Sequence, residues 1–268
     1  MFELAAATSS DPGFIAQSWQ ILQTYWPMFL RGAGVTLLIA ITGTLTGSVI
    51  GLIIGMIRTI PVNPTDSKLK KGLFKVINWV LSVYIEIFRG TPMIVQAMVI
   101  FYGLAFATGK SMPVLLAGFV IVSINTGAYM AEIVRGGIIA VDKGQFEAAH
   151  SIGMNHWQTM VNIVMPQVLR NILPATGNEF VINIKDTSVL SVISVTELFF
   201  ASRSIAGINF KYFQVFLITC IMYLIMTFTI TRLLRLLERK LAGSATYTIH
   251  GSQTTPESEI KVEDTHGR

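Results

Sequence analysis

The sequence has little of what a soluble enzyme usually contains. Of its 268 residues only 13% are charged, whereas an average soluble domain has about a quarter. Its one cysteine, Cys220, excludes an internal disulfide and a zinc site built from several thiolates. With 52% hydrophobic residues and a mean hydropathy of +0.60, the chain matches neither a disordered protein nor a secreted disulfide scaffold.

The charges are also unevenly placed. The excess of 20 Lys and Arg over 15 Asp and Glu would fit a nucleic-acid-binding protein. Most of these charges lie between long apolar runs, however, which indicates contact with a lipid bilayer and no nucleic acid.

Uncharged runs long enough to cross a bilayer recur along the chain. A spanning helix needs about 20 apolar residues, and four runs contain no formal charge: Gly32–Ile57, Gly90–Gly109, Ser111–Ala131 and Tyr212–Thr231. A fifth region, Pro174–Leu198, is mostly apolar but contains four charged residues: Glu179, Lys185, Asp186 and Glu197. Since irregular backbone is not stable in lipid, we predict an all-α, polytopic membrane protein with about five transmembrane helices.

The basic residues predict how these spans are oriented. If the N-terminus is outside, the inner loops and flanks hold 12 of them: Arg58, Lys68, Lys70, Lys71, Lys75, Arg135, Lys143, Arg170, Arg232, Arg235, Arg239 and Lys240. The outer ones hold 4: Arg31, Lys110, Arg203 and Lys211. Cytoplasmic loops are enriched in Lys and Arg, so we expect the N-terminus outside and, with an odd number of spans, the C-terminus inside.

The sequence divides into three parts: an outer-face segment (residues 1–31), a transmembrane domain (32–240) and a disordered cytoplasmic tail (241–268). In the first part, Ile15, Trp19, Leu22 and Trp26 follow one helical face. That stripe predicts a helix lying on the outer interface or packing against the first span. No basic region precedes the apolar stretch, so we expect no signal peptide. The end of the chain, from Ser244, is polar and cannot bury a core.

The long inner loop predicts a contact with another protein. Helix-forming residues from Glu147 are followed by Gly153, which allows a short helix to stop and turn. Asn155, His156 and Trp157 then restart a helix that leads back to the membrane. Such a short helix is suited to docking into a groove of a partner, although a solvated loop is equally compatible with the composition.

Nucleotide and metal sites are not expected in this chain. The stretch Gly103–Ser111 resembles a phosphate-binding loop, but five residues separate its glycines where four are needed. His150 and His156 are six residues apart, which is poor spacing for metal ligands.

The inner loop also resembles the cytoplasmic signature of bacterial ABC-importer permeases. That signature reads Glu-Ala-Ala, three residues, Gly, nine residues, Ile, one residue and Leu-Pro. The sequence matches it at six positions: Glu147, Ala148, Ala149, Gly153, Ile163 and Pro166. Met165 stands where Leu is usual, a volume-conserving apolar exchange. Further segments resemble the branch for polar amino acids: Phe88–Pro92, Tyr129–Gly137, Pro166–Gln167 and Lys185–Ser188.

This resemblance covers roughly residues 30 to 240 and implies a type I ABC-importer permease fold in a bacterial cell membrane. It implies a second permease subunit, identical or similar, and two ATPase subunits that bind ATP and Mg. It also implies an extracytoplasmic amino-acid-binding protein. The chain itself would be no enzyme and would hold no cofactor, and its signature loop would carry the coupling helix that contacts the ATPase.

Charged residues at membrane depth are the candidates for substrate binding, because they are costly there unless they are paired or used. A zwitterionic amino acid needs a cation and an anion, which Lys185 and Asp186 supply beside Thr187 and Ser188. Glu132 is a further candidate for the substrate's ammonium group.

The same charges have structural alternatives. Lys185 and Asp186 could instead pair with other spans, or with Glu179 and Glu197. Arg89 is placed either to pair with Glu86 one turn earlier or to line the substrate path.

Two other functional classes remain as alternatives. An ion-coupled secondary amino acid transporter would also carry intramembrane charges, but such proteins are often built from repeated halves. A structural scaffold would need few such charges.

Overall fold

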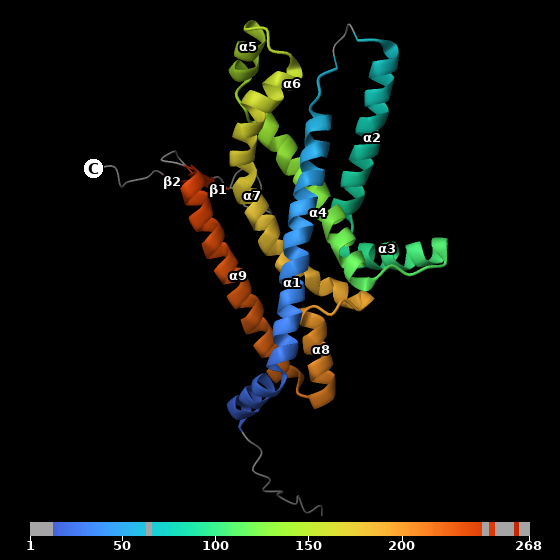
Figure 1. The fold of residues 1–268 in the computed structure, drawn as a ribbon, viewed down its shortest axis with the longest axis vertical. Coiled ribbons are helices and arrows are strands. Elements are labelled where there is room, and N and C mark those ends of the chain that lie inside the picture. The colour runs from blue at the N-terminus through green and yellow to red at the C-terminus, as the bar shows by residue number, and fades with distance from the viewer. Residues whose placement is uncertain (1–12, 63–65, 243–246, 250–259, 263–268) are drawn as a thin grey trace, which may run out of the picture.

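The computed structural model describes residues 13–62, 66–242, 247–249 and 260–262 (Figure 1). Within these ranges nine α-helices make up most of the fold: α1 (Phe14–Arg58), α2 (Lys68–Gly90), α3 (Met93–Thr108), α4 (Val114–Ile139), α5 (Lys143–Ser151), α6 (His156–Thr159), α7 (Met165–Asp186), α8 (Leu198–Asn209) and α9 (Tyr212–Ala242). A π-helical turn, η1 (Met160–Val164), precedes α7, and a 3₁₀-helix, η2 (Thr187–Ile193), follows it. The predicted helical membrane class is therefore confirmed.

The helices α1 and α4 form the centre of the molecule and lie side by side over much of their length (Figure 1). Glycines at every fourth position of α1 (Gly43, Gly47, Gly51 and Gly55) face α4. A Cβ atom at Gly51 would lie 2.6 Å from the carbonyl carbon of Met130 and 2.7 Å from the amide nitrogen of Ala131. Small residues at a four-residue interval are a common way for membrane helices to bring their backbones together.

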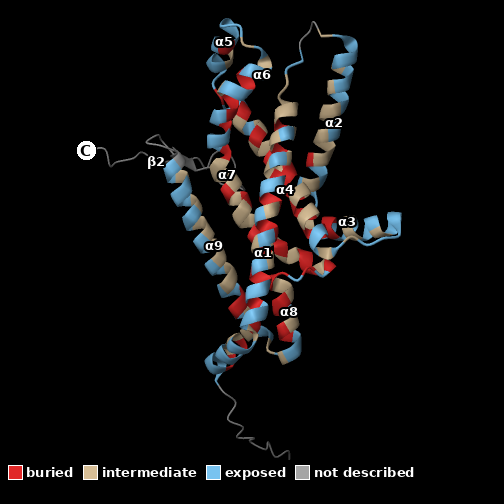
Figure 2. Cartoon of the chain, in the orientation of Figure 1, coloured by how far each residue is buried: buried red, intermediate tan, exposed pale blue. Residues whose placement is uncertain are grey.

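Three apolar clusters hold the remaining helices to this pair. The first joins α4 to the inner loop and α7 around Val134 and Val164. The second joins α1, α3, α4 and η2 around Ile121, and the third joins α1, α8 and α9 around Phe29 and Ile205. The helix α9 is only loosely covered: 17% of its most apolar window is buried, against 61% in α4 (Figure 2). Most of the surface of α9 is therefore available to lipid.

Three helices (α1, α4 and α9) are long and apolar enough to cross a membrane alone, and counting each of two bent helix pairs as one span gives up to five. The predicted span Gly90–Gly109 is not a straight spanning helix. Its helical part is α3, which has 16 residues, about 24 Å at 1.5 Å per residue, and α3 is bent by 116° from α2. The helix breaks at Thr91 and Pro92 because proline offers no backbone N–H to continue it.

The other bent pair, His156–Ile193 with Leu198–Asn209, overlaps the predicted polar span Pro174–Leu198 but extends beyond both of its ends. The helix α7 starts earlier, at Met165, with Pro174 inside it. It passes at Asp186 into η2, and η2 ends at Ser194 with a φ of 67° before α8 begins. The two helical parts of the pair meet at 54°.

The ends of the chain are described only in part. The helix α1 runs through the predicted boundary at residue 31 and contains Pro27, and its N-terminal end is inclined to the rest (Figure 1). Of the predicted stripe, Ile15, Trp19 and Trp26 are exposed, whereas Leu22 is half-buried and packs against the third apolar cluster. Most of the predicted tail, residues 241–268, lies outside the described residues. The described parts are the last residues of α9 and two strands, β1 (Tyr247–Ile249) and β2 (Ile260–Val262), which pair antiparallel with Tyr247 opposite Val262.

Candidate functional site

The turn of the signature loop is formed by its own backbone, as predicted. At the end of α5 the N–H of Gly153 donates to the carbonyl of His150 over 3.0 Å. The N–H of Met154 donates to the carbonyl of Ala149 over 3.1 Å. These two bonds form the Schellman motif, which requires a left-handed residue directly after the helix, and Gly153 has a φ of 82°. A Cβ at Gly153 would meet no atom within 4 Å, so the turn needs glycine for its backbone conformation.

The restart of the helix is also local. Asn155 and Gln158 form a capping box at the start of α6, each side chain accepting from the backbone N–H of the other over 2.9 Å. The turn η1, which contains Ile163, then leads into α7, whose second residue is Pro166. Proline is well tolerated there because the first helical N–H groups have no partner within the helix.

The loop presents an apolar tip at one end of the molecule (Figure 1). Ile152 is 77% exposed and Trp157 is 68% exposed, while Glu147 and Ala148 are exposed beside them. Ala149 is buried. Exposed apolar side chains that lie together often mark a docking surface. The sequence interpretation did not single out Ile152 or assign Trp157 this role, although both are large apolar residues in a polar loop.

The candidate Glu132 takes part in an ion-pair cluster. Its carboxylate accepts from the guanidinium of Arg58, the last residue of α1, and from Nη2 of Arg135 over 3.0 Å. Arg58 also donates to the hydroxyl of Ser82 on α2 over 3.3 Å. Among the described residues, the salt bridges of Glu132 do not include Lys185. Glu132 therefore links α1, α2 and α4.

The candidates Lys185 to Ser188 lie where α7 changes into a 3₁₀-helix. Lys185 is exposed, Asp186 and Ser188 are half-buried, and Thr187 is buried, its hydroxyl donating to the carbonyl of Ile184 over 3.0 Å. The backbone stays helical through Thr187, and the helix ends only at Ser194.

A second carboxylate, that of Glu179, lies on the same helix as Lys185 and Asp186. It is buried on α7, seven residues before Asp186 and hence on the same helical face. Both Asp186 and Arg89 lie close enough to act on the charge of Glu179.

Two of the pairings left open by the sequence are not formed. In the described part of the chain no salt bridge joins Arg89 to Glu86; the guanidinium of Arg89 lies over the ring of Tyr129, 5.5 Å from its centroid, a cation–π geometry. Glu197 is not a partner of Lys185 either. Fully buried, Glu197 caps α8 by accepting from the N–H groups of Phe199 and Phe200 over 2.8 and 2.6 Å, and from the Tyr223 hydroxyl over 3.0 Å.

Uncharged polar residues form a network that the sequence interpretation missed. The amide nitrogen of Asn183 on α7 donates to the hydroxyls of Thr44 on α1 over 2.8 Å and Thr126 on α4 over 3.0 Å. All three side chains are buried. Nearby, Gln96 accepts from Asn125 over 2.8 Å and donates to the carbonyls of Phe88 and Thr91 at the break between α2 and α3. That break is possible in an apolar setting because side chains satisfy the freed carbonyls.

Comparison with known proteins agrees with this architecture. The family model described as binding-protein-dependent transport system inner membrane component matches residues 71–243. The chain is 36% identical over 224 residues to the glutamine transport system permease protein GlnP of Escherichia coli K12, covering 83% of this chain and 97% of that protein. It is 34% identical over 225 residues to the L-cystine transport system permease protein TcyB of Bacillus subtilis, covering 83% and 91%.

A solved structure gives the same result for the fold. The crystal structure of an amino acid ABC transporter with histidines matches with a TM-score of 0.72 at 36% identity, covering 85% of this chain and 98% of that chain. The match confirms the predicted type I permease fold. The chain belongs to the family of inner-membrane components of binding-protein-dependent transport systems.

Proposed function

We propose that this protein is the permease subunit of an ATP-driven ABC importer for polar or charged amino acids. The relatives are permeases for glutamine and cystine, and the matched structure is an amino acid ABC transporter. The ion-coupled alternative is not supported, since the family and these relatives are components of binding-protein-dependent systems or ABC transporters.

The observation that carries the mechanism is the exposed turn between α5 and α6. Its tip presents Ile152 and Trp157, while Val141 and Met160 at its base belong to the apolar cluster that holds α4 and α7. A partner that moves the tip therefore moves both helices. We assign that partner to an ATPase subunit, which would bind ATP and Mg, while this chain holds no cofactor. The loop residues Glu147, Ala148, Ala149, Gly153, Ile163 and Pro166 then form the coupling segment.

This assignment fixes the orientation of the chain. The loop tip faces the cytoplasm, the start of α1 lies outside, and the end of α9 lies inside, in agreement with the distribution of Lys and Arg. The five spans are α1, the bent pair of α2 and α3, α4, the bent pair ending in α8, and α9. A binding protein delivers the substrate from outside, and a second permease subunit completes the path.

The substrate path follows the polar face of α7. Lys185 and Asp186 bind the amino acid's carboxylate and ammonium groups, with Thr187 and Ser188 beside them and Arg89 facing from α2. Glu179 adds a carboxylate to this set. Glu132 plays a different part from the one the sequence indicated: already held by Arg58 and Arg135, it ties α1 and α2 to α4 close to the coupling loop.

Reconstitution tests this proposal. The permease is placed in proteoliposomes with the ATPase and binding protein encoded by neighbouring genes, and uptake is measured with a panel of labelled amino acids. We expect uptake of glutamine-, glutamate-, arginine- or histidine-type substrates that requires internal ATP and survives collapse of sodium and proton gradients. Uptake driven by an ion gradient without ATP, or uptake of sugars, peptides or metal ions alone, would contradict it.

A further inference from the structure

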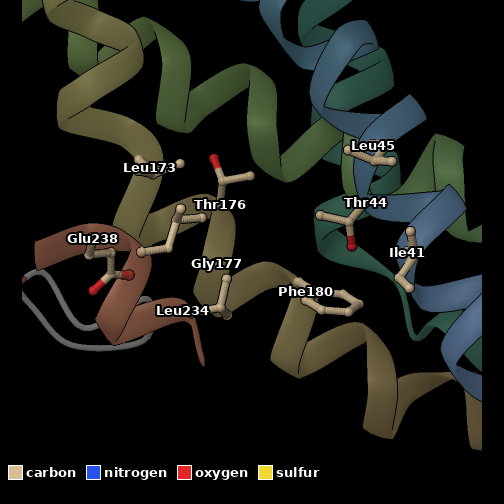
Figure 3. Close-up of a pocket in the computed structure, with 10 residues that line it drawn as sticks. Ile41, Thr44, Leu45, Leu173, Thr176, Gly177, Phe180, Leu234 and Glu238 are labelled. Carbon is tan, nitrogen blue, oxygen red and sulfur yellow. The ribbon is translucent and has the colours of Figure 1, made fainter. Parts of the chain in front are cut away.

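A groove lies between α1, α7 and α9, apart from the polar face that we assign to the substrate (Figure 3). Its volume is about 200 Å³. Ten residues line it: Ile41, Thr44, Leu45, Leu173, Thr176, Gly177, Phe180, Leu234, Leu237 and Glu238. The groove follows α7 for two turns, from Leu173 to Phe180, and its walls are almost entirely apolar. Its volume is below the roughly 300 Å³ at which sites for compact small molecules begin.

The groove opens to the surroundings of the helix bundle. Leu45 is 63% exposed, Leu237 is 47% exposed and Ile41 is 44% exposed. In a membrane this opening faces lipid, because α9 is the least covered of the three helices that can span alone. A narrow, apolar groove open along one side fits a linear hydrocarbon chain better than a compact polar solute.

Basic residues surround one end of the groove. The helix α7 begins and α9 ends on the same side of the molecule (Figure 1). There, Arg170 lies on the helical face of Leu173 and Gly177, at spacings of three and seven residues. Arg235, Arg239 and Lys240 follow the lining residue Leu234 on α9, and all four basic side chains are exposed.

Glu238 is the one carboxylate among the lining residues. Arg235 lies three residues before Glu238 and Lys240 three residues after Leu237, so both share the groove side of α9 and the charge at this end of the groove is net positive. Basic pockets between helices on the cytoplasmic side of a membrane are typical sites for anionic lipid head groups.

We propose that this groove binds an anionic phospholipid. One acyl chain lies between α1, α7 and α9, and the phosphate group lies among Arg170, Arg235 and Lys240. The bound lipid fills the space beside α9 and holds this helix against α7. Because the groove walls are almost entirely apolar and Lys185 and Asp186, five and six residues after Phe180, lie on other faces of α7, the lipid is a structural ligand and not the transported solute.

Native mass spectrometry of the purified full-length chain in detergent, titrated with phosphatidylglycerol or phosphatidylcholine, tests this. We expect one phosphatidylglycerol to be retained with at least a tenfold preference over phosphatidylcholine. Leu237→Trp places an indole in the groove and should reduce retention several-fold, whereas Leu236→Trp, one residue along on the opposite face of α9, should not. Both leucines are about half exposed, so the two exchanges are matched in size and depth.

The charge requirement has its own variants, which do not alter any packed side chain. The double exchange Arg235→Gln and Lys240→Gln should abolish the preference for phosphatidylglycerol. Its control, Arg31→Gln with Arg203→Gln, removes two exposed basic residues from the other end of the bundle and should leave the preference intact.

Three results would overturn the proposal. They are equal retention of both lipids by the wild type, wild-type retention by Leu237→Trp, and an unchanged preference after the double exchange in α9. If Leu237→Trp instead changes the fraction of dimer while lipid retention stays the same, the groove is a contact with a second copy of the chain.

Discussion

The Gly51→Ala exchange should destabilise the protein through a single added methyl group. Its Cβ would lie 2.6 Å from the carbonyl carbon of Met130, whereas ordinary contacts begin at 3.4 Å. The nearest neighbours are the Cβ of Met130 at 2.3 Å and backbone atoms of Met130 and Ala131, none of which a rotamer change can move, so α1 and α4 must separate by about 1.1 Å over this turn. Overpacking of this kind costs about 1–3 kcal/mol, which outweighs the gain of about 1 kcal/mol that alanine brings over glycine in a helix.

Thermal unfolding of the purified protein in detergent, followed by tryptophan fluorescence, measures this effect. The control is Gly34→Ala in the same helix, where an added Cβ meets no atom within 4 Å; it should keep or raise Tm. Met130→Ala should not rescue Gly51→Ala, because the obstructing backbone atoms remain. A Tm of Gly51→Ala equal to or above that of Gly34→Ala would refute the close approach of the two backbones.

Three further predictions concern α7 and the loop. Asn183→Leu leaves two buried hydroxyls without their partner and should cost about 1–2 kcal/mol in thermal stability; an unchanged Tm would mean that the network contributes nothing. Gly153→Glu forces a side chain into a left-handed conformation that costs about 1–2 kcal/mol, so it should abolish ATPase co-purification and transport. Gly153→Asn tolerates this conformation better and should retain part of both. Equal behaviour of the two variants and the wild type would exclude a coupling role. Lys185→Met and Asp186→Asn should each weaken apparent substrate affinity about tenfold, with little change in Tm. This corresponds to the loss of one charge-assisted hydrogen bond. Lost stability at unchanged affinity would show a structural role instead.

The features that the sequence predicted well arise from interactions between residues that are close together in the chain. The inner loop folds through bonds between residues at most five positions apart, such as Met154 to Ala149 and Asn155 to Gln158. The helices α1, α4 and α9 are apolar around most of their circumference, so a search for uncharged runs finds them.

The same search fails for α2, because an amphipathic helix carries charges on one face and still contributes to a span. It therefore placed a straight span over Gly90–Gly109, where the chain turns by 116°.

The partners of individual polar residues could not be predicted in this way. Glu132 pairs with Arg58, 74 residues away, and Asn183 bonds to Thr44, 139 residues away. Asn183 and the two threonines carry no formal charge, so they did not stand out among the apolar residues around them. The four-residue spacing of the glycines in α1 does not by itself reveal their partner. Only the position of α4 shows which helix they contact.

The four-residue spacing of the glycines in α1 limits how this protein can change shape. If α1 slid along α4 by one residue, bulky side chains would replace glycines against the backbone of α4. Equivalent positions recur only after four residues, about 6 Å along the helix, so intermediate displacements are sterically blocked. The two helices must therefore move as one rigid body during transport. Contacts that can be made and broken in small steps lie elsewhere, for example the hydrogen bonds between Asn183 and the rotatable hydroxyls of Thr44 and Thr126.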